Sequence, residues 1–431
     1  MRLQPDTGIG AAARSVAFAC LLLPLLAADA AAQRGTPAPI RTQQLADPSL
    51  APRQRAYAPE DLARAKASLP RFQSGNGRPA IVLTGYWPPS NEAVRRFSPD
   101  PAQNPLGWLG SDWEGRGYDV YAFFPEFSPP DCSNCGRGSG DLEVDYQDTT
   151  FDYWPIVDTL QPIAVITTSR GFSNRDWELE MNQYNRFSWI GDYAPPYQPT
   201  PAPPDVDKPV DYLRNTSLPV QDIVNAILAS GVNVNPFICF SGSGGGFLSE
   251  FIAYLGVWYR GKHASPADAD WCVAAGHVHI GGQVDWPTAQ AALEITLRTV
   301  ITHVDGEVAA RVCKPDLGFG GPGSSVLAVC GDALATGGRA DLLLTGGAPG
   351  AAAWLVVGPT FQPTAWNGGL VVPVPPTRLV AVTLDADGRF LLPEVPGGRG
   401  PRTLYVQAVH RDTAQAQGWG ISNALRVEFL P

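Results

Sequence analysis

Between residues 79 and 303, short apolar runs alternate with segments whose apolar residues recur at helical spacing, and this alternation limits the possible folds strongly. The run 81–83 predicts a buried strand, and 220–230 predicts a helix that ends at Gly231. Strands that alternate with helices are typical of a layered α/β fold. We therefore predict a layered α/β fold with a mostly parallel sheet over residues 79–303.

The individual elements of this α/β region follow from the same patterns. A proline-rich stretch at 193–209 predicts a loop, because proline cannot donate to a strand ladder. We expect strands at 81–83, 118–123, 163–167, 236–240 and 272–280, and helices at 152–160, 220–230, 247–259 and 287–303. One short helix is expected before this region, at 59–68.

The pattern changes after about residue 310, where short apolar or alternating runs are separated by Gly, Pro and Asp-Gly turns. No helical period remains, so residues 310–431 are predicted to form an all-β domain, a β-sandwich. The runs 378–384 and 389–393 are predicted to pair as a hairpin. Asp385 and Asp387, between them, could bind calcium, but the needs of an Asp-Gly turn explain them more simply.

Composition narrows the functional classes. A chain of 431 residues with 44% hydrophobic residues fits two folded domains with substantial cores. The net charge of -10 argues against binding to nucleic acid or to an anionic membrane surface. The sequence does not set the oligomeric state.

The first 32 residues have the features of a secretion signal. Arg2 and Arg14 precede an apolar stretch at 16–26, and Ala-x-Ala patterns follow at 28–32. This stretch is short for a membrane span and contains a proline. We expect cleavage near Ala30 or Ala32, a linker over 33–78, and a secreted, periplasmic or cell-surface location.

Seven cysteines occur in the chain, and Cys20 would be removed with the signal. The remaining six form an even set, which suggests disulfides in a secreted protein. Proximity predicts three pairs: Cys132 with Cys135, Cys239 with Cys272, and Cys313 with Cys330. The CxxC at 132–135 could also be half of a zinc site, but no second CxxC or histidine cluster completes it.

The stretch FICFSGSGGGFLSEFIAYLG at 237–256 predicts a strand, a glycine-rich turn and a helix. Its spacing does not match a nucleotide-binding glycine pattern, which also belongs after a first strand. The glycines could simply permit close packing of strand and helix. A third interpretation is that the helix N-terminus presents a nucleophile, where backbone amides stabilise an oxyanion.

A nucleophile needs a base and a group that orients the base. We predict His279 as the base, because it lies nearest the end of the strand 272–280, where ligands bind in parallel sheets. We expect His277 to point to the opposite face of that strand. The acid candidates are Asp176, Glu178 and Glu180, after the strand at 163–167.

Five motifs in this order resemble those of the pyroglutamyl peptidase I family, cysteine peptidases that remove N-terminal pyroglutamate from peptides. The resemblance covers about residues 79–303 and implies a doubly wound α/β sheet with helices on both faces. The motifs are TGYWPP at 84–89 with the Asn104-Pro105 pair, EMNQYN at 180–185, TSLP at 216–219 with the helix to Gly231, the segment 241–250 with Tyr254, and AGHVH at 275–279.

The resemblance implies roles for individual residues. It places Glu180 at the position that orients His279, and we expect a short hydrogen bond between the two side chains. We expect Glu178 on the opposite side of the strand. The catalytic cysteine of the family falls on Ser249, and an aromatic residue of its first motif falls on Pro89. Tyr86 and Asn104 are implied to contact the substrate, which we expect to be a peptide or a small amide, and we expect no cofactor.

Two functions follow from these patterns. The first is a secreted hydrolase that transfers an acyl group to Ser249, with His279 as base and acid, and acts on N-terminal amide bonds, pyroglutamyl bonds among them. A hydroxyl is a weaker nucleophile than a thiolate, so Ser249 would depend strongly on His279. The alternative is a catalytically inactive binding module with the same fold, on the cell surface or in the extracellular space.

Overall fold

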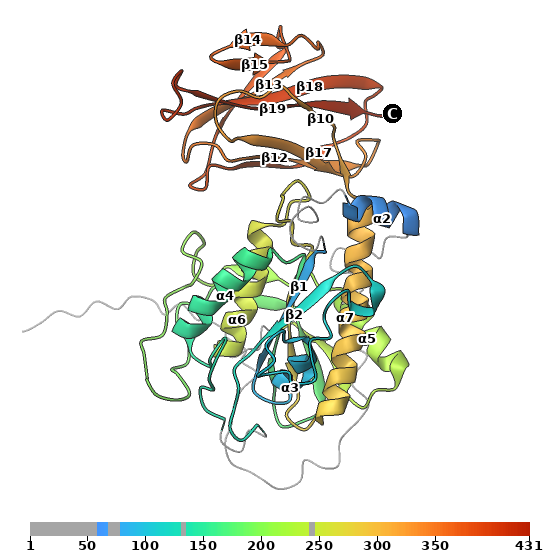
Figure 1. Cartoon of the computed structure of the whole chain (residues 1–431), viewed down its shortest axis with the longest axis vertical. Helices are drawn as coiled ribbons and strands as arrows, with labels where there is room; N and C mark the ends of the chain where they lie inside the picture. Colours follow the sequence, from blue (N-terminus) through green and yellow to red (C-terminus); the bar gives the residue numbers. More distant parts are fainter. Residues whose placement is uncertain (1–57, 68–77, 131–134, 241–245) are drawn as a thin grey trace, which may run out of the picture.

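The computed structural model describes residues 58–67, 78–130, 135–240 and 246–431. An α/β part comes first along the chain, and a β-sandwich lies against one end of it (Figure 1). The predicted signal at 1–32 lies outside the described residues, and within the predicted linker the structure contains the helix α2 (Pro59–Ala67). Among the described helices, none combines the length and apolar character that crossing a bilayer requires.

The α/β part is built on a six-stranded mixed sheet, in agreement with the predicted α/β fold. Strands β1, β2, β3 and β8 run parallel to one another, whereas β4 pairs antiparallel with β8 and parallel with β7. The strand that precedes the glycine-rich turn, β7, therefore runs opposite to β8. In sheet order the strands are β2 (Asp119–Phe123), β1 (Ala80–Tyr86), β3 (Ala164–Arg170), β8 (Ala274–Ile280), β4 (Asp176–Glu180) and β7 (Asn235–Cys239).

Helices cover both faces of this sheet (Figure 1). On one face lie α4 (Tyr146–Leu160) and α6 (Leu248–Lys262), and on the other lie α3 (Ser90–Val94), α5 (Val220–Ser230) and α7 (Trp286–Ala310). Two short 3₁₀ helices, Arg95–Phe97 and Trp113–Gly115, and a small pair of strands, β5 (Asn182–Tyr184) and β6 (Leu213–Asn215), complete this part.

Helix α5 has the predicted bounds, whereas α4 begins earlier than predicted. The buried face of α5 includes Ile223 and Ile227, and Gly231 follows it with a left-handed φ of 72°. Helix α4 begins after Asp145, whose side chain accepts hydrogen bonds from the backbone amides of Gln147 and Asp148. Because Asp145 caps the helix, α4 includes a first turn that does not follow the apolar periodicity, and the sequence pattern therefore did not predict it.

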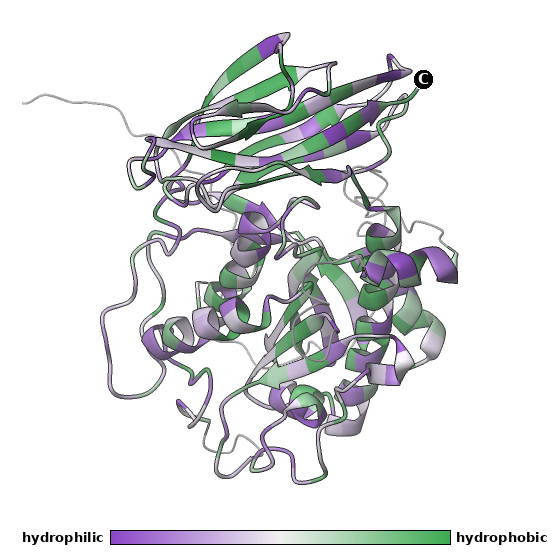
Figure 2. Ribbon diagram, turned by 45° about the horizontal axis from the view of Figure 1, so that its top comes forward, coloured by the Kyte–Doolittle hydropathy of each residue, from purple (hydrophilic) through white to green (hydrophobic). Residues whose placement is uncertain are grey.

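The C-terminal part consists of two antiparallel sheets packed face to face, as expected for a sandwich. Leu327 and Leu342 of one sheet share a buried cluster with Leu355 and Val406 of the other. Figure 2 shows apolar residues alternating with polar ones along these strands. The five-stranded sheet contains β10 (Asp316–Gly318), β19 (Trp419–Phe429), β18 (Arg402–Arg411), β13 (Ala352–Gly358) and β16 (Arg378–Thr383). The four-stranded sheet contains β17 (Phe390–Pro396), β12 (Arg339–Thr345), β11 (Val326–Gly331) and β9 (Val312–Cys313), and β14 (Thr364–Trp366) pairs with β15 (Gly369–Val371).

The predicted hairpin between the runs 378–384 and 389–393 is wrong. Strand β16 pairs with β13 and strand β17 pairs with β12, so the connection crosses from one sheet to the other. The connection is still an Asp-Gly turn, because Asp385 accepts hydrogen bonds from the amides of Asp387 and Arg389, and Gly388 has a φ of 69°. The Asp-Gly turn determines that the chain reverses between β16 and β17, but it does not determine which strands they pair with.

One of the three predicted disulfides is present, one is wrong, and one stays a prediction. Cys313 and Cys330 are bonded, with their Cα atoms 4.0 Å apart. Cys239 and Cys272 form no disulfide and are both buried. Cys239 ends β7, and Cys272 lies two residues before β8. Strand β4 lies between β7 and β8, so these strands are not neighbours in the sheet as expected, and each strand spacing adds about 4.8 Å. Cys132 lies outside the described residues, so its pairing with Cys135 is untested.

Loss of the Cys313–Cys330 bond should destabilise the sandwich, because the bond closes a loop with a sequence separation of 17 residues. We expect a Cys313→Ala/Cys330→Ala variant to lose about 3 kcal/mol of unfolding free energy in urea. Reduced wild-type protein should lose a similar amount. Alkylation of the unreduced, denatured protein should label Cys239 and Cys272 and leave Cys313 unlabelled; label on Cys313 would contradict the pairing.

Candidate active site

Three neighbouring strands carry polar side chains on the same face of the sheet. Side chains two residues apart on a strand point to the same side, so strand register brings these residues together. Six residues form this polar row: Thr167 and Ser169 on β3, His277 and His279 on β8, and Glu178 and Glu180 on β4. Helix α6 covers the face, because its Gly256 lies against Thr167.

The Glu180–His279 pair is the central contact of this row. His279 Nδ1 lies 2.9 Å from Glu180 Oε1, which confirms the predicted hydrogen bond, and both side chains are buried. Burial by itself lowers the pKa of His279. The hydrogen bond and charge of Glu180, with the charges of Glu178 and Glu250, outweigh burial and hold that pKa above its ordinary value.

The predicted position of Glu178 is wrong. Its Oε2 lies 4.0 Å from His279 Nδ1, on the same side of β4 as Glu180. Side chains two residues apart on a strand point to the same side, so Glu178 and Glu180 cannot lie on opposite sides of β4. Glu178 is thus a second carboxylate beside the imidazole, one that acts through its charge.

The expectation that His277 faces away from His279 is wrong for the same reason. The two rings meet edge to face with centroids 4.7 Å apart. His277 Nδ1 contacts the Thr167 hydroxyl at 2.8 Å and Nε2 contacts the Ser169 hydroxyl at 2.9 Å. Burial, and then the charge of His279, hold the pKa of His277 well below its ordinary value. His277 is therefore a neutral neighbour that occupies the space beside His279.

Ser249 lies in the first turn of α6 and is half-buried. The helix runs antiparallel to β8, since its last residues end where the Cys272 amide donates to the His263 carbonyl at 2.8 Å. Gly256 lies level with Thr167 and therefore with His277. From the level of Gly256, Ser249 lies about 10 Å along the helix. From the level of His277, His279 lies about 7 Å along β8, in the same direction. The nucleophile and base candidates thus occupy the same end of the sheet.

Sequence inspection missed a buried ion pair beside Ser249. Glu250 is fully buried, and its Oε2 accepts hydrogen bonds from Arg186 Nε at 2.6 Å and from the Gly246 amide at 2.9 Å. Burial raises the pKa of Glu250, although Arg186 opposes this shift. A glutamate in the first turn of a helix that accepts a hydrogen bond from a preceding backbone amide is a known capping pattern. This pattern could have identified Glu250 from the sequence. The pair holds the described end of the glycine-rich turn.

The two residues implied to contact substrate both lie in the interior. Tyr86 ends β1, and its hydroxyl is 2.5 Å from the Thr149 hydroxyl. The Asn104 amide donates to the carbonyls of Arg96, Ser98 and Gly107, so it holds a loop. The implied substrate contacts stay predictions. The part of the glycine-rich turn predicted to form an oxyanion pocket, 241–245, lies outside the described residues.

Two groups of described residues have ligand atoms spaced closely enough for a metal ion. They are Glu178, Glu180 and His279 in the polar row, and His263, Asp268 and Asp270 after α6. Protein partners already engage both groups. His279 Nδ1 contacts Glu180, and Asp268 forms an ion pair with Arg389 of the sandwich at 2.5 Å.

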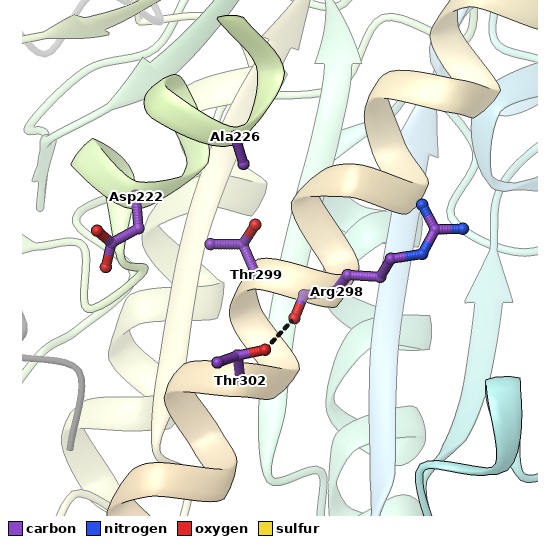
Figure 3. A pocket seen from close by; sticks show the side chains of 5 residues that line it. All are labelled: Asp222, Ala226, Arg298, Thr299 and Thr302. Carbon is purple, nitrogen blue, oxygen red and sulfur yellow. Dashed lines mark hydrogen bonds between the residues drawn. The ribbon is translucent and has the colours of Figure 1, made fainter. Parts of the chain in front are cut away.

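A shallow hollow of about 230 Å³ lies between α5 and α7, away from the polar row (Figure 3). Its lining residues are Asp222, Ala226, Arg298, Thr299 and Thr302. The Thr302 hydroxyl donates to the Arg298 carbonyl at 2.9 Å, and the Arg298 guanidinium is paired with Glu114 at 2.7 Å. These polar groups are occupied, and we assign no function to this hollow.

No protein-family model and no curated protein sequence matches the chain. Solved structures similar to this chain include pyrrolidone carboxyl peptidase from Thermococcus litoralis, at 14% identity and a TM-score of 0.39, over 53% of this chain and 95% of that one. Pyroglutamyl peptidase I from Bacillus amyloliquefaciens matches at 17% identity with a TM-score of 0.38, over 53% of this chain and 97% of that one. This chain thus resembles pyroglutamyl peptidases over about half its length, at low identity.

Proposed function

We propose that this chain is a hydrolase that cleaves amide bonds by acyl transfer to Ser249. The supporting observation is the buried hydrogen bond of 2.9 Å between Glu180 and His279, on the sheet face covered by the helix that carries Ser249. A nucleophilic serine requires a base that is oriented by a third group. The resemblance of the five sequence motifs to the pyroglutamyl peptidase I family assigns the same roles to Ser249, His279 and Glu180.

The mechanism follows from the tautomer that Glu180 selects. With the Nδ1 proton held by Glu180, Nε2 of His279 is the nitrogen that accepts the hydroxyl proton of Ser249. The Ser249 oxygen then attacks the carbonyl carbon, and His279 returns the proton to the departing amine. Water, deprotonated by His279, attacks the ester and releases the acid with Ser249 restored.

The substrate class and the location are further parts of this proposal. N-terminal amides, with pyroglutamyl amides first among them, are proposed from the sequence motifs alone. Secretion is proposed from the apolar and small-residue pattern at 16–32. A serine at the nucleophile position agrees with a location outside the cell, because an accessible catalytic thiol there is open to oxidation.

The direct test is a panel of chromogenic N-blocked aminoacyl amides and esters, with pyroglutamyl anilide included, together with a fluorophosphonate probe. We expect turnover of at least one compound and covalent labelling at Ser249, located by peptide mass spectrometry. Heat-denatured protein should not be labelled, since the hydroxyl reacts only with its base in place. Native protein that neither turns over a compound nor takes up the probe would favour the inactive binding module.

A further inference from the structure

A larger cavity lies between the α/β part and the sandwich, at the opposite end of the sheet from His279. Its volume is about 500 Å³, within the roughly 300–1,000 Å³ of small-molecule sites. The α/β wall comes from the ends of α6 and α7 and the segment before β8, and the opposite wall comes from β11, β12 and β17. Figures 1 and 2 both show the ends of these helices next to the sandwich.

The α/β wall carries two arginines, Arg260 and Arg311, and one carboxylate, Glu307. Arg260 Nε is buried and has no hydrogen-bond partner in the part of the chain that the structure describes. Burial lowers the pKa of Arg260, although the charge of Glu307 acts in the opposite direction. A buried guanidinium is normally paired with an anion, because desolvation of an unpaired charge is costly. The position of Arg260 beside a cavity therefore favours an anionic group within it.

Arg311 is held in place beside the same cavity. Its Nε donates to the Pro266 carbonyl at 2.6 Å, and its guanidinium lies 5.9 Å from the ring of Trp271. Both Arg311 and Trp271 line the cavity. This fixed geometry lets Arg311 add a second positive charge on the α/β side without a further ordering cost.

The sandwich wall has the opposite character. Its charged residues are Asp332, Asp341, Glu394 and Arg339, and Arg339 forms an ion pair with Glu394 at 3.0 Å. Asp341 Oδ1 accepts a hydrogen bond from the Glu394 amide at 2.9 Å, which fixes the carboxylate at the wall. The charged residues that line the cavity thus give a net positive charge on the α/β wall and a net negative charge on the sandwich wall.

We propose that this cavity binds a small zwitterion, a free amino acid or a short peptide with unblocked ends. The carboxylate of the ligand would pair with Arg260 and Arg311, and its ammonium group would pair with Asp341 and Asp332. Each charge then meets its complement, and the ligand joins the two parts of the protein. This site is separate from the proposed active site and does not depend on its chemistry.

Calorimetry on the His279→Ala full-length chain can test this proposal without turnover. The probes are alanyl-alanine, N-acetyl-alanyl-alanine, which lacks the ammonium group, and alanyl-alaninamide, which lacks the carboxylate. We expect saturable binding of alanyl-alanine and at least about 10-fold weaker binding of either blocked form, as expected for the loss of a charged hydrogen bond. Equal binding of all three, or no binding of alanyl-alanine, would overturn the proposal.

Variants on both walls locate the site. Arg260→Gln and Asp341→Asn should each weaken alanyl-alanine at least about 10-fold. Asparagine keeps an oxygen for the Glu394 amide, so this variant tests the sandwich wall even if Arg260→Gln fails to fold. The control is Arg64→Gln, an arginine on α2 whose side chain is 77% exposed, and it should leave binding unchanged. Unchanged affinity in Asp341→Asn would exclude this cavity.

Discussion

Replacing Ser249 with alanine should lower kcat by roughly 10⁴-fold or more and abolish labelling by a fluorophosphonate, because the acyl acceptor is removed. The change removes one oxygen from a half-buried side chain in the first turn of α6, so the fold should remain intact. The measurement is steady-state turnover of the best compound of the panel, with circular dichroism as the check on folding. Full activity in this variant would place catalysis elsewhere.

Two further variants sharpen this test. Ser249→Cys should keep some activity and become sensitive to iodoacetamide, since His279 can draw the proton from the thiol. The wild type should resist iodoacetamide, because its Cys239 and Cys272 are buried. Ser169→Ala is the matched control. Ser169 contacts His277 at 2.9 Å but is itself buried, and its loss should change kcat by less than about 10-fold. A larger loss would indicate that His277 and Ser169 belong to the catalytic machinery.

Replacing Glu180 with glutamine should reduce kcat by roughly 10³–10⁴-fold, since an amide neither fixes the Nδ1 proton nor stabilises the imidazolium. The pH dependence should change as well. His279 must be neutral to act as base, so wild-type kcat/KM should rise with pH through the raised pKa of His279, above about 6.5. Removal of the Glu180 charge lowers that pKa, and the acid limb should move to lower pH.

Glu178→Gln is the matched control for this prediction. Glu178 lies 4.0 Å from the same imidazole nitrogen and acts through its charge. We expect a loss of less than about 10-fold in kcat and a smaller movement of the acid limb, in the same direction. A greater loss in Glu178→Gln than in Glu180→Gln would reverse the two roles.

Much of the α/β part could be predicted from local patterns. Helix α5 has its predicted bounds, because its apolar period and the glycine after it are properties of adjacent residues. The pairing of Glu180 with His279 was anticipated from sequence motifs. The position of His277 was also available, since strand periodicity places residues 277 and 279 on one face, and the contrary prediction misapplied this rule.

The sequence alone thus determined which segments become strands and helices and which residue types could act as nucleophile, base and acid. Only the tertiary structure decided the order and direction of the strands. The insertion of β4 between β8 and β7 separates Cys239 from Cys272 and brings two carboxylates to His279. The tertiary structure also formed the cavity between Arg260 and Asp341, because the residues that line it come from segments far apart in the sequence. Local periodicity reflects contacts within a few residues, whereas sheet order and domain contacts depend on the burial of whole faces.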